Sequence, residues 1–215
     1  MNLFSNDSFL GKVLGMIGDT VLLNLLFILC SLPAVTAGAS FCALYYVLME
    51  KQKDPDIPVA AAFFRAFREN LKQGIPAWLI VLAAGLLLYE DCRIFSPGGL
   101  YANTMLFDLF IILAVILVLP AIWLFPVISA FRSSLKNLFI QSFFFAFKNL
   151  PWTIVLAGLW FLPIFMTFRN ADYLLIGVSL WLIFGFALVA GIQSRIFYRK
   201  FLPCQNPGSS GGHSD

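Results

Sequence analysis

The sequence predicts an all-α polytopic membrane protein with about five transmembrane helices. Of the 215 residues, 60% are hydrophobic and only 12% are charged, which is about half the charged fraction of an average soluble domain. The mean hydropathy is +0.89, and several apolar stretches reach the roughly 20 residues that a helix needs to cross a bilayer. These observations exclude a soluble enzyme, and a net charge of +3 gives no reason to expect a nucleic-acid partner.

The first long apolar stretch, about 19–49, is interrupted by Leu32-Pro33 near its middle. Proline removes a backbone donor and disfavours helix in the residue before it. Two interpretations stay open: one span kinked at Pro33, or two pieces of about 15 residues that form a re-entrant hairpin. Fifteen residues rise only about 22 Å, less than a hydrocarbon core of about 30 Å. The kinked span is therefore the favoured prediction, and it would place the N-terminus on the side opposite to residue 50.

The later apolar stretches are long enough to cross a bilayer without interruption. Together with the first stretch they predict a single membrane domain over residues 1–203. The last residues, 204–215, are rich in Gly and Ser and are expected to form a disordered tail. The four later spans are expected at about 75–94, 101–131, 151–168 and 173–194.

Basic residues are distributed unequally between the predicted connections. Eleven of the fourteen Lys and Arg residues lie in or beside the connections 50–74 and 132–150 or after the last span. Basic residues in short connections near span ends are retained in the cytoplasm. We therefore expect both connections and the C-terminus to be cytoplasmic.

Both of these connections have the pattern of an amphipathic helix, one over about 57–73 and the other over about 134–149. Gly74 and Pro76 are expected to end the first of them. A basic amphipathic helix beside a membrane span usually lies at the interface with the lipid bilayer, and the alternative is a docking surface for a cytoplasmic partner. The candidate docking residues are Phe63, Phe64, Arg65, Phe67, Arg68, Phe143, Phe147 and Lys148.

The same helices belong to a candidate internal repeat. Residues 62–71 resemble residues 142–150, and Leu-Pro-Ala-Val at 32–35 has a counterpart in Leu-Pro-Ala-Ile at 119–122. Span, cytoplasmic amphipathic helix and span would then occur twice with the same orientation, a parallel repeat of the kind found among transporters, with the fifth span outside it. The alternative is that Phe-rich amphipathic helices are similar through composition alone.

Charged residues also gather at the predicted outer ends of the spans. Charge inside a bilayer is costly, so Asp108 is expected to face protein or a water-filled cavity, with Arg93 or Arg169 as its partner. An interfacial salt-bridge network, a solute-contacting cluster and solvated loops are all compatible with this pattern. The candidate outer polar cluster comprises Glu90, Asp91, Arg93, Asp108, Arg169 and Asp172.

Residue types that carry catalysis or bind metals are sparse. His213 is the only histidine, and the four cysteines form no CxxC pair, so neither a histidine-based triad nor a zinc site is expected. No glycine-rich nucleotide motif occurs. We expect no catalytic residue, no metal and no cofactor, and Asp91 with Asp108 is the only pair that an enzyme on the outer face could use.

Residues 24–39 (NLLFILCSLPAVTAGA) and 43–46 (ALYY) resemble the opening signature of the YesL-like bacterial membrane proteins. Residues 63–70 (FFRAFREN) resemble the first cytoplasmic segment of that family, and the length and span pattern are also similar. The family contains a domain of largely unknown function, and its members are often encoded beside carbohydrate ABC importers. The resemblance implies a multi-pass protein of the bacterial plasma membrane, and it supplies no catalytic or ligand residue.

Two functions follow as predictions. The first is a non-catalytic accessory component of carbohydrate uptake, which would dock on the permease subunits of an ABC importer through its cytoplasmic helices. The second is a small-solute permease that acts on its own, for which prolines within the spans and Asp108 are suitable features. Hydrogen-bonding side chains within the spans are few and dispersed, which favours the first function.

Overall fold

The computed structural model of the chain describes residues 9–169 and 171–205, and their side chains over 13–169 and 174–201. Every regular element within these ranges is a helix. The helices are α1 (Phe9–Ser31), α2 (Ala37–Glu50), α3 (Val59–Phe95), α4 (Thr104–Ala130), α5 (Leu135–Lys148), α6 (Leu150–Phe168), α7 (Ala171–Leu180) and α8 (Phe186–Gln205), with the 3₁₀ turn η1 (Ala34–Thr36) and the π-helical turn η2 (Trp181–Gly185).

The predicted fold class is confirmed, because five helical segments of the described chain are long and apolar enough to cross a membrane. The first of them lies entirely in α1, whereas α2, with 14 residues, rises only about 21 Å and is too short to cross. α7, η2 and α8 together supply the last one. The five segments are Val13–Ser31, Val59–Phe95, Thr104–Ala130, Leu150–Phe168 and Leu174–Phe201.

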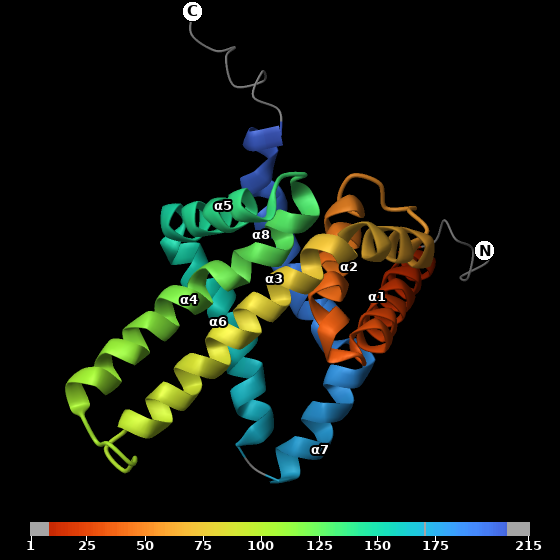
Figure 1. Cartoon of the computed structure of the whole chain (residues 1–215). Helices are drawn as coiled ribbons and strands as arrows, with labels where there is room; N and C mark the ends of the chain where they lie inside the picture. Colours follow the sequence, from red (N-terminus) through yellow and green to blue (C-terminus); the bar gives the residue numbers. More distant parts are fainter. Residues whose placement is uncertain (1–8, 170, 206–215) are drawn as a thin grey trace, which may run out of the picture.

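Residues 19–49 belong to two helices joined by a turn, so the prediction of one span kinked at Pro33 is wrong (Figure 1). The two pieces of the hairpin alternative are present, although α1 by itself is long enough to cross a membrane. The side chain of Asp19, in the middle of α1, forms an ion pair with that of Lys51, at the C-terminal end of α2. Such a contact requires the two helices to run antiparallel. The N-terminal end of α1 therefore lies on the same face as the connection after α2.

The hairpin turn is built around Pro33, which is extended with ψ 103° and has no N–H to donate to a helix. Thr36 compensates for the interrupted helical hydrogen bonds. Its hydroxyl donates to the carbonyl oxygen of Cys30 at 2.7 Å and lies 2.8 Å from that of Pro33. The chain therefore reverses direction between α1 and α2.

The first amphipathic segment and the second span form one continuous helix. α3 passes through Gly74 and Pro76 without ending, so the expected helix end at these residues is wrong. Gly74 packs against the backbone of Ala39 in α2, where an added Cβ would lie 2.8 Å from the Ala39 Cα. This contact holds α3 at the point where it turns from the surface into the apolar part of the molecule (Figure 1).

The predicted end of the last span and the predicted start of the tail also differ from the structure. Whereas α4 and α6 lie close to the predicted spans 101–131 and 151–168, α8 continues to Gln205. Residues 204 and 205 are therefore helical and not part of the predicted disordered tail. The rest of that tail, 206–215, lies outside the described residues.

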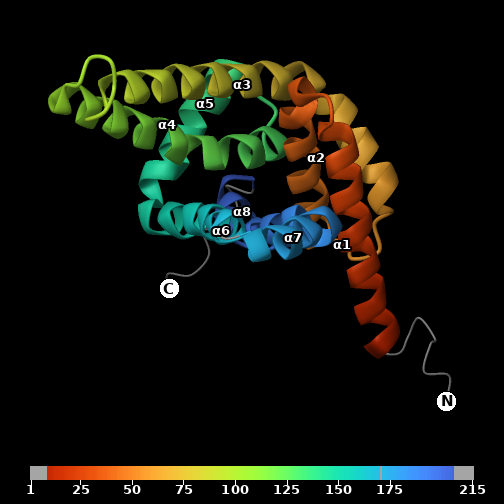
Figure 2. The same cartoon turned by 90° about the horizontal axis from the view of Figure 1, so that it is seen from below.

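Two faces of the molecule are distinguished by their elements. The face that carries the 51–58 connection, the segment 59–74 of α3, α5 and the C-terminal end of α8 is called the basic face below. The turn after α3 and the turn after α6 lie on the opposite face, and they are well separated in both views (Figures 1 and 2).

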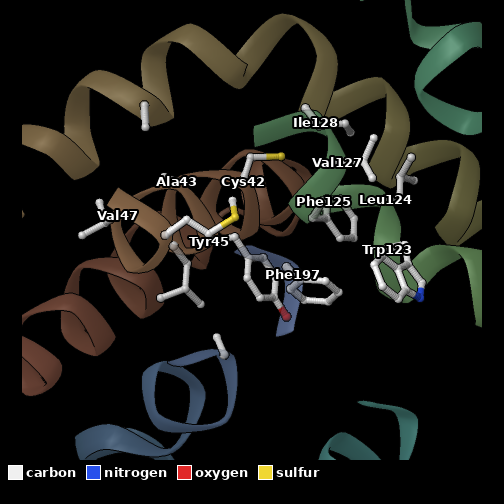
Figure 3. Packing of buried hydrophobic residues seen from close by; sticks show 14 of the residues in the cluster. Cys42, Ala43, Tyr45, Val47, Trp123, Leu124, Phe125, Val127, Ile128 and Phe197 are labelled. Carbon is white, nitrogen blue, oxygen red and sulfur yellow. The ribbon is translucent and has the colours of Figure 1, made fainter. Parts of the chain in front are cut away.

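The buried core lies nearer to the basic face, where α2, α4 and α8 meet. Tyr45, Trp123 and Phe197 converge there from the three helices (Figure 3), with the Phe197 ring 5.5 Å from that of Tyr45 and 4.9 Å from that of Trp123. Edge-to-face aromatic pairs of this kind add to the burial of apolar area. This core fixes the positions of the surface helices above it.

Candidate functional site

The segment 59–74 of α3 buries one side and exposes the other. Phe63 is fully buried and Phe67 half-buried, whereas Phe64, Arg65 and Arg68 are exposed. A buried side chain cannot contact a partner, so Phe63 is removed from the candidate docking surface. The three exposed residues remain on it.

Arg65 is held in place by α2. Its Nη2 donates to the hydroxyl of Tyr46 at 3.0 Å, and its guanidinium lies 5.8 Å from the centroid of the same ring. A guanidinium over an aromatic ring is a favourable cation–π arrangement. Arg65 is thus fixed to the body of the protein while the exposed Arg68 lies one turn further along α3.

The surface segment of α3 contacts the connection that precedes α5. Arg132, in the connection between α4 and α5, donates to Glu69 of α3 at 3.0 Å. Close by, Nε2 of Gln73 donates to the carbonyl oxygen of Ser133 at 2.8 Å. Exposed ion pairs contribute little stability, so we interpret these contacts as setting the relative position of α3 and α5.

α5 turns an apolar face away from the protein. Ile140, Phe143, Phe144 and Phe147 are exposed at helical spacing, and we call them the α5 outer face. The candidate residue Lys148 flanks it, with Nζ 5.2 Å from the centroid of the Phe144 ring. Ile140 and Phe144 are absent from the docking residues predicted from sequence, although their i, i+3, i+4, i+7 spacing with Phe143 and Phe147 was a usable signal.

The structure does not bring the candidate outer polar cluster together. Glu90 and Arg93 form an exposed ion pair of 3.3 Å at the end of α3, with Asp91 half-buried beside them. Asp108 is exposed on α4, so it does not pack against protein within the described chain, and no ion pair described there includes it.

The remaining two members of that cluster lie where α6 ends and α7 begins. Arg169 is exposed at the C-terminal end of α6, and the side chain of Asp172 lies outside the described residues. Because the two turns of the opposite face are apart (Figures 1 and 2), Arg169 is not the partner of Asp108. Nor does any group of three or more His, Cys, Asp or Glu in the described part of the chain have the arrangement of a metal site.

A buried polar network centred on Gln193 crosses the interior. Gln193 of α8 is fully buried, and its Oε1 accepts hydrogen bonds from the Tyr45 hydroxyl at 2.7 Å and from Nε1 of Trp160 at 2.9 Å. Its Nε2 donates to the carbonyl oxygen of Leu156 at 2.8 Å. The network therefore ties α2, α6 and α8 together.

Asn24 of α1 performs a similar task at the π-helical turn η2. Its Nδ2 donates to the carbonyl oxygens of Trp181 and Leu182 at 3.1 and 2.8 Å, and its Oδ1 accepts from the backbone N–H of Ala187 at 3.0 Å. A π-helical turn disturbs the normal backbone hydrogen bonds, and this side chain bonds the backbone groups on both sides of the disturbance. Asn24 thereby connects α1 to the last spanning segment.

An apolar groove of about 460 Å³ lies between α6 and the α7–η2–α8 segment. Thr167 and Trp181 supply polar side-chain atoms to its lining, and Nε1 of Trp181 donates to Oγ1 of Thr167 at 3.2 Å. The Thr167 hydroxyl in turn donates to the carbonyl oxygen of Pro163 at 2.9 Å. A hydrophilic solute would find few free hydrogen-bonding groups in this groove.

Comparison with known proteins confirms the resemblance to the YesL-like proteins. Residues 20–92 match the family model described as "Protein of unknown function, DUF624", a region that runs from α1 through α2 and most of α3. The chain is 27% identical over 183 residues to "Uncharacterized protein YesL" of Bacillus subtilis (strain 168), a match that covers 83% of each chain. No solved structure matches the chain.

Proposed function

We propose that this YesL-like membrane protein is a non-catalytic accessory component of carbohydrate uptake. It docks through its basic face, on the cytoplasmic side of the bacterial plasma membrane, onto the permease subunits of an ABC-type importer. The observation that supports the docking is the pair of surface helices on the basic face, each of which exposes phenylalanine beside Lys or Arg. The connection to carbohydrate uptake is supported by the resemblance to the YesL-like family, because members of that family are often encoded beside such importers.

The composition of this surface is suited to protein contact. Aromatic side chains and Arg are enriched among the residues that dominate binding energies at interfaces. Phe64 and Arg68 on α3 and the α5 outer face provide both types on the basic face. The bilayer covers part of α5 as well, since a helix of this pattern lies at the membrane interface.

The permease subunits should be lost when this surface is altered. We expect Phe64→Ala/Arg68→Ala and Phe143→Ala/Phe147→Ala to reduce the permease recovered with the tagged protein at least about tenfold in mild detergent, because central interface residues each contribute about 2 kcal/mol or more. Quantitative immunoblotting of the co-purified permease measures the effect. Each variant is first checked for an unchanged melting temperature in detergent.

A matched control is available on α4. Leu109 and Ile112 are exposed and apolar but lie towards the opposite face, so Leu109→Ala/Ile112→Ala should leave the recovered permease unchanged. Equal recovery with the control and with both surface variants would contradict docking through the basic face. Failure of the unaltered protein to retain any permease would contradict the accessory function itself.

The alternative function, a small-solute permease, has less support. Asp108 is exposed near the start of α4, and the buried amides of Asn24 and Gln193 are already engaged with protein groups. A sugar path needs several hydrogen-bonding side chains that are free to bind the solute. Uptake by proteoliposomes that contain only this chain, lost in Asp108→Asn, would favour the permease over the accessory component.

A further inference from the structure

The groove between α6 and the last spanning segment has the dimensions of a site for one hydrocarbon chain. Its lining extends from Ile176 on α7 to Val189 on α8, a rise of about 20 Å along the helices. This is comparable to one leaflet, about half of a hydrocarbon core of roughly 30 Å. Ile176 and Leu188 in the lining are exposed, so the groove is open to the surrounding bilayer.

The chemistry of the lining restricts the occupant to an apolar group. Thr167 is buried, and its hydroxyl is bonded to Trp181 and to the Pro163 carbonyl. The side chains of Met166, Ile176 and Leu188 complete the wall. A buried polar group of a ligand would have no partner here, and leaving it unpaired costs free energy.

The walls of the groove are fixed by contacts of its lining residues with one another and with Trp160 and Asn24. At its end near the opposite face, a Cβ added to Gly177 would lie 2.6 Å from Thr167 Cγ2, so α6 and α7 approach closely there. Further in, the rings of Trp160 and Trp181 stack with centroids 6.1 Å apart, and Asn24 holds the carbonyl of Trp181. A preformed cavity lowers the ordering cost that binding must overcome.

A cation follows the groove lining in sequence, at the end of α6. Arg169 is exposed directly after α6 and only two residues beyond Thr167, at the end of the groove near the opposite face. Arg presents a planar array of donors that suits phosphate oxygens. We propose that the groove binds one acyl chain of a phospholipid from the leaflet at the opposite face, and that Arg169 contacts its phosphate.

The site is tested by lipid titration of the full-length protein in detergent, with native mass spectrometry to count bound lipid. The probes are phosphatidylglycerol and a diacylglycerol with the same two acyl chains. We expect one phosphatidylglycerol to bind, with diacylglycerol weaker by about tenfold, as expected for loss of a charge-assisted hydrogen bond. Equal affinity for the two lipids would overturn the contact between Arg169 and phosphate.

Two pairs of matched variants separate the chain from the headgroup. Ile176→Trp places a bulky ring in the lining and should abolish retention of phosphatidylglycerol, whereas Leu175→Trp, at an exposed neighbour that does not line the groove, should not. Arg169→Gln should lower the affinity for phosphatidylglycerol to that for diacylglycerol. Arg93→Gln, in the last turn of α3, should leave the affinity for phosphatidylglycerol unchanged. Equal retention by Ile176→Trp and Leu175→Trp would overturn the site.

Discussion

Replacing Gly38 with alanine is expected to lower the stability of the detergent-solubilised protein by about 1–3 kcal/mol, the usual cost of overpacking a close contact. A Cβ at Gly38 would lie 2.2 Å from the carbonyl oxygen of Gly74 and 2.5 Å from the Cβ of Trp78. The nearer of these atoms belongs to the backbone and cannot turn aside. The helices α2 and α3 would therefore have to separate, and Gly74→Ala should act in the same direction.

Two other helical glycines provide matched controls. A Cβ at Gly85 or Gly158 would meet nothing within 4 Å, so Gly85→Ala and Gly158→Ala should leave stability unchanged or raise it by up to about 1 kcal/mol through helix propensity. Thermal unfolding in detergent measures all four variants. If Gly38→Ala were as stable as Gly85→Ala, the close crossing of α2 and α3 would be refuted.

The second large effect is expected for Gln193→Leu, which removes the centre of the buried polar network. The Tyr45 hydroxyl and Nε1 of Trp160 would lose their acceptor, and an unsatisfied buried polar group costs about 1–3 kcal/mol. Hydrogen bonds between helices in a membrane average only about 0.6 kcal/mol. We therefore expect a loss between these values for each broken bond.

A double-mutant cycle makes this prediction specific. Tyr45→Phe removes the hydroxyl that Gln193 accepts from, so once Tyr45 is Phe the Gln193→Leu change should cost less than it does alone. Residues in one hydrogen-bond network show such interaction energies. Strictly additive losses of unfolding free energy would contradict the network.

The fold class and most span boundaries could be predicted because they depend on local composition and length. The hairpin at Pro33 could not be chosen over a kinked span, since the local pattern is the same for both. The hairpin brings together residues far apart in the chain, such as Asp19 and Lys51, which lie 32 residues apart. Contacts of this kind are fixed by tertiary packing.

The environments of the candidate residues could likewise not be predicted from local sequence. Asn24 and Gln193 stand out as polar residues in apolar helices, but the partners of Asn24 are 157 and 158 residues away. Phe63 and Phe64 are adjacent and equally apolar, yet Phe63 is buried and Phe64 is exposed. Asp108 is only four residues after the start of α4 at Thr104, so a small error in the predicted boundary changes its expected environment.

Cysteine labelling in intact cells tests the central claim, that the basic face is cytoplasmic and carries both ends of the α1–α2 hairpin. Single cysteines replace Asn6, Asp56 and Leu100 in a background in which the native cysteines are alanine. Asp56 lies in the connection after α2, and Leu100 lies in the turn after α3.

We expect Asn6→Cys and Asp56→Cys to be protected from a membrane-impermeant thiol reagent until the cells are permeabilised, and Leu100→Cys to react in both conditions. Labelling of Asn6→Cys while Asp56→Cys stays protected would contradict the hairpin and restore the kinked span. Labelling of Asp56→Cys in intact cells would place the basic face outside the cell. It would then contradict docking of this face on the importer from the cytoplasmic side.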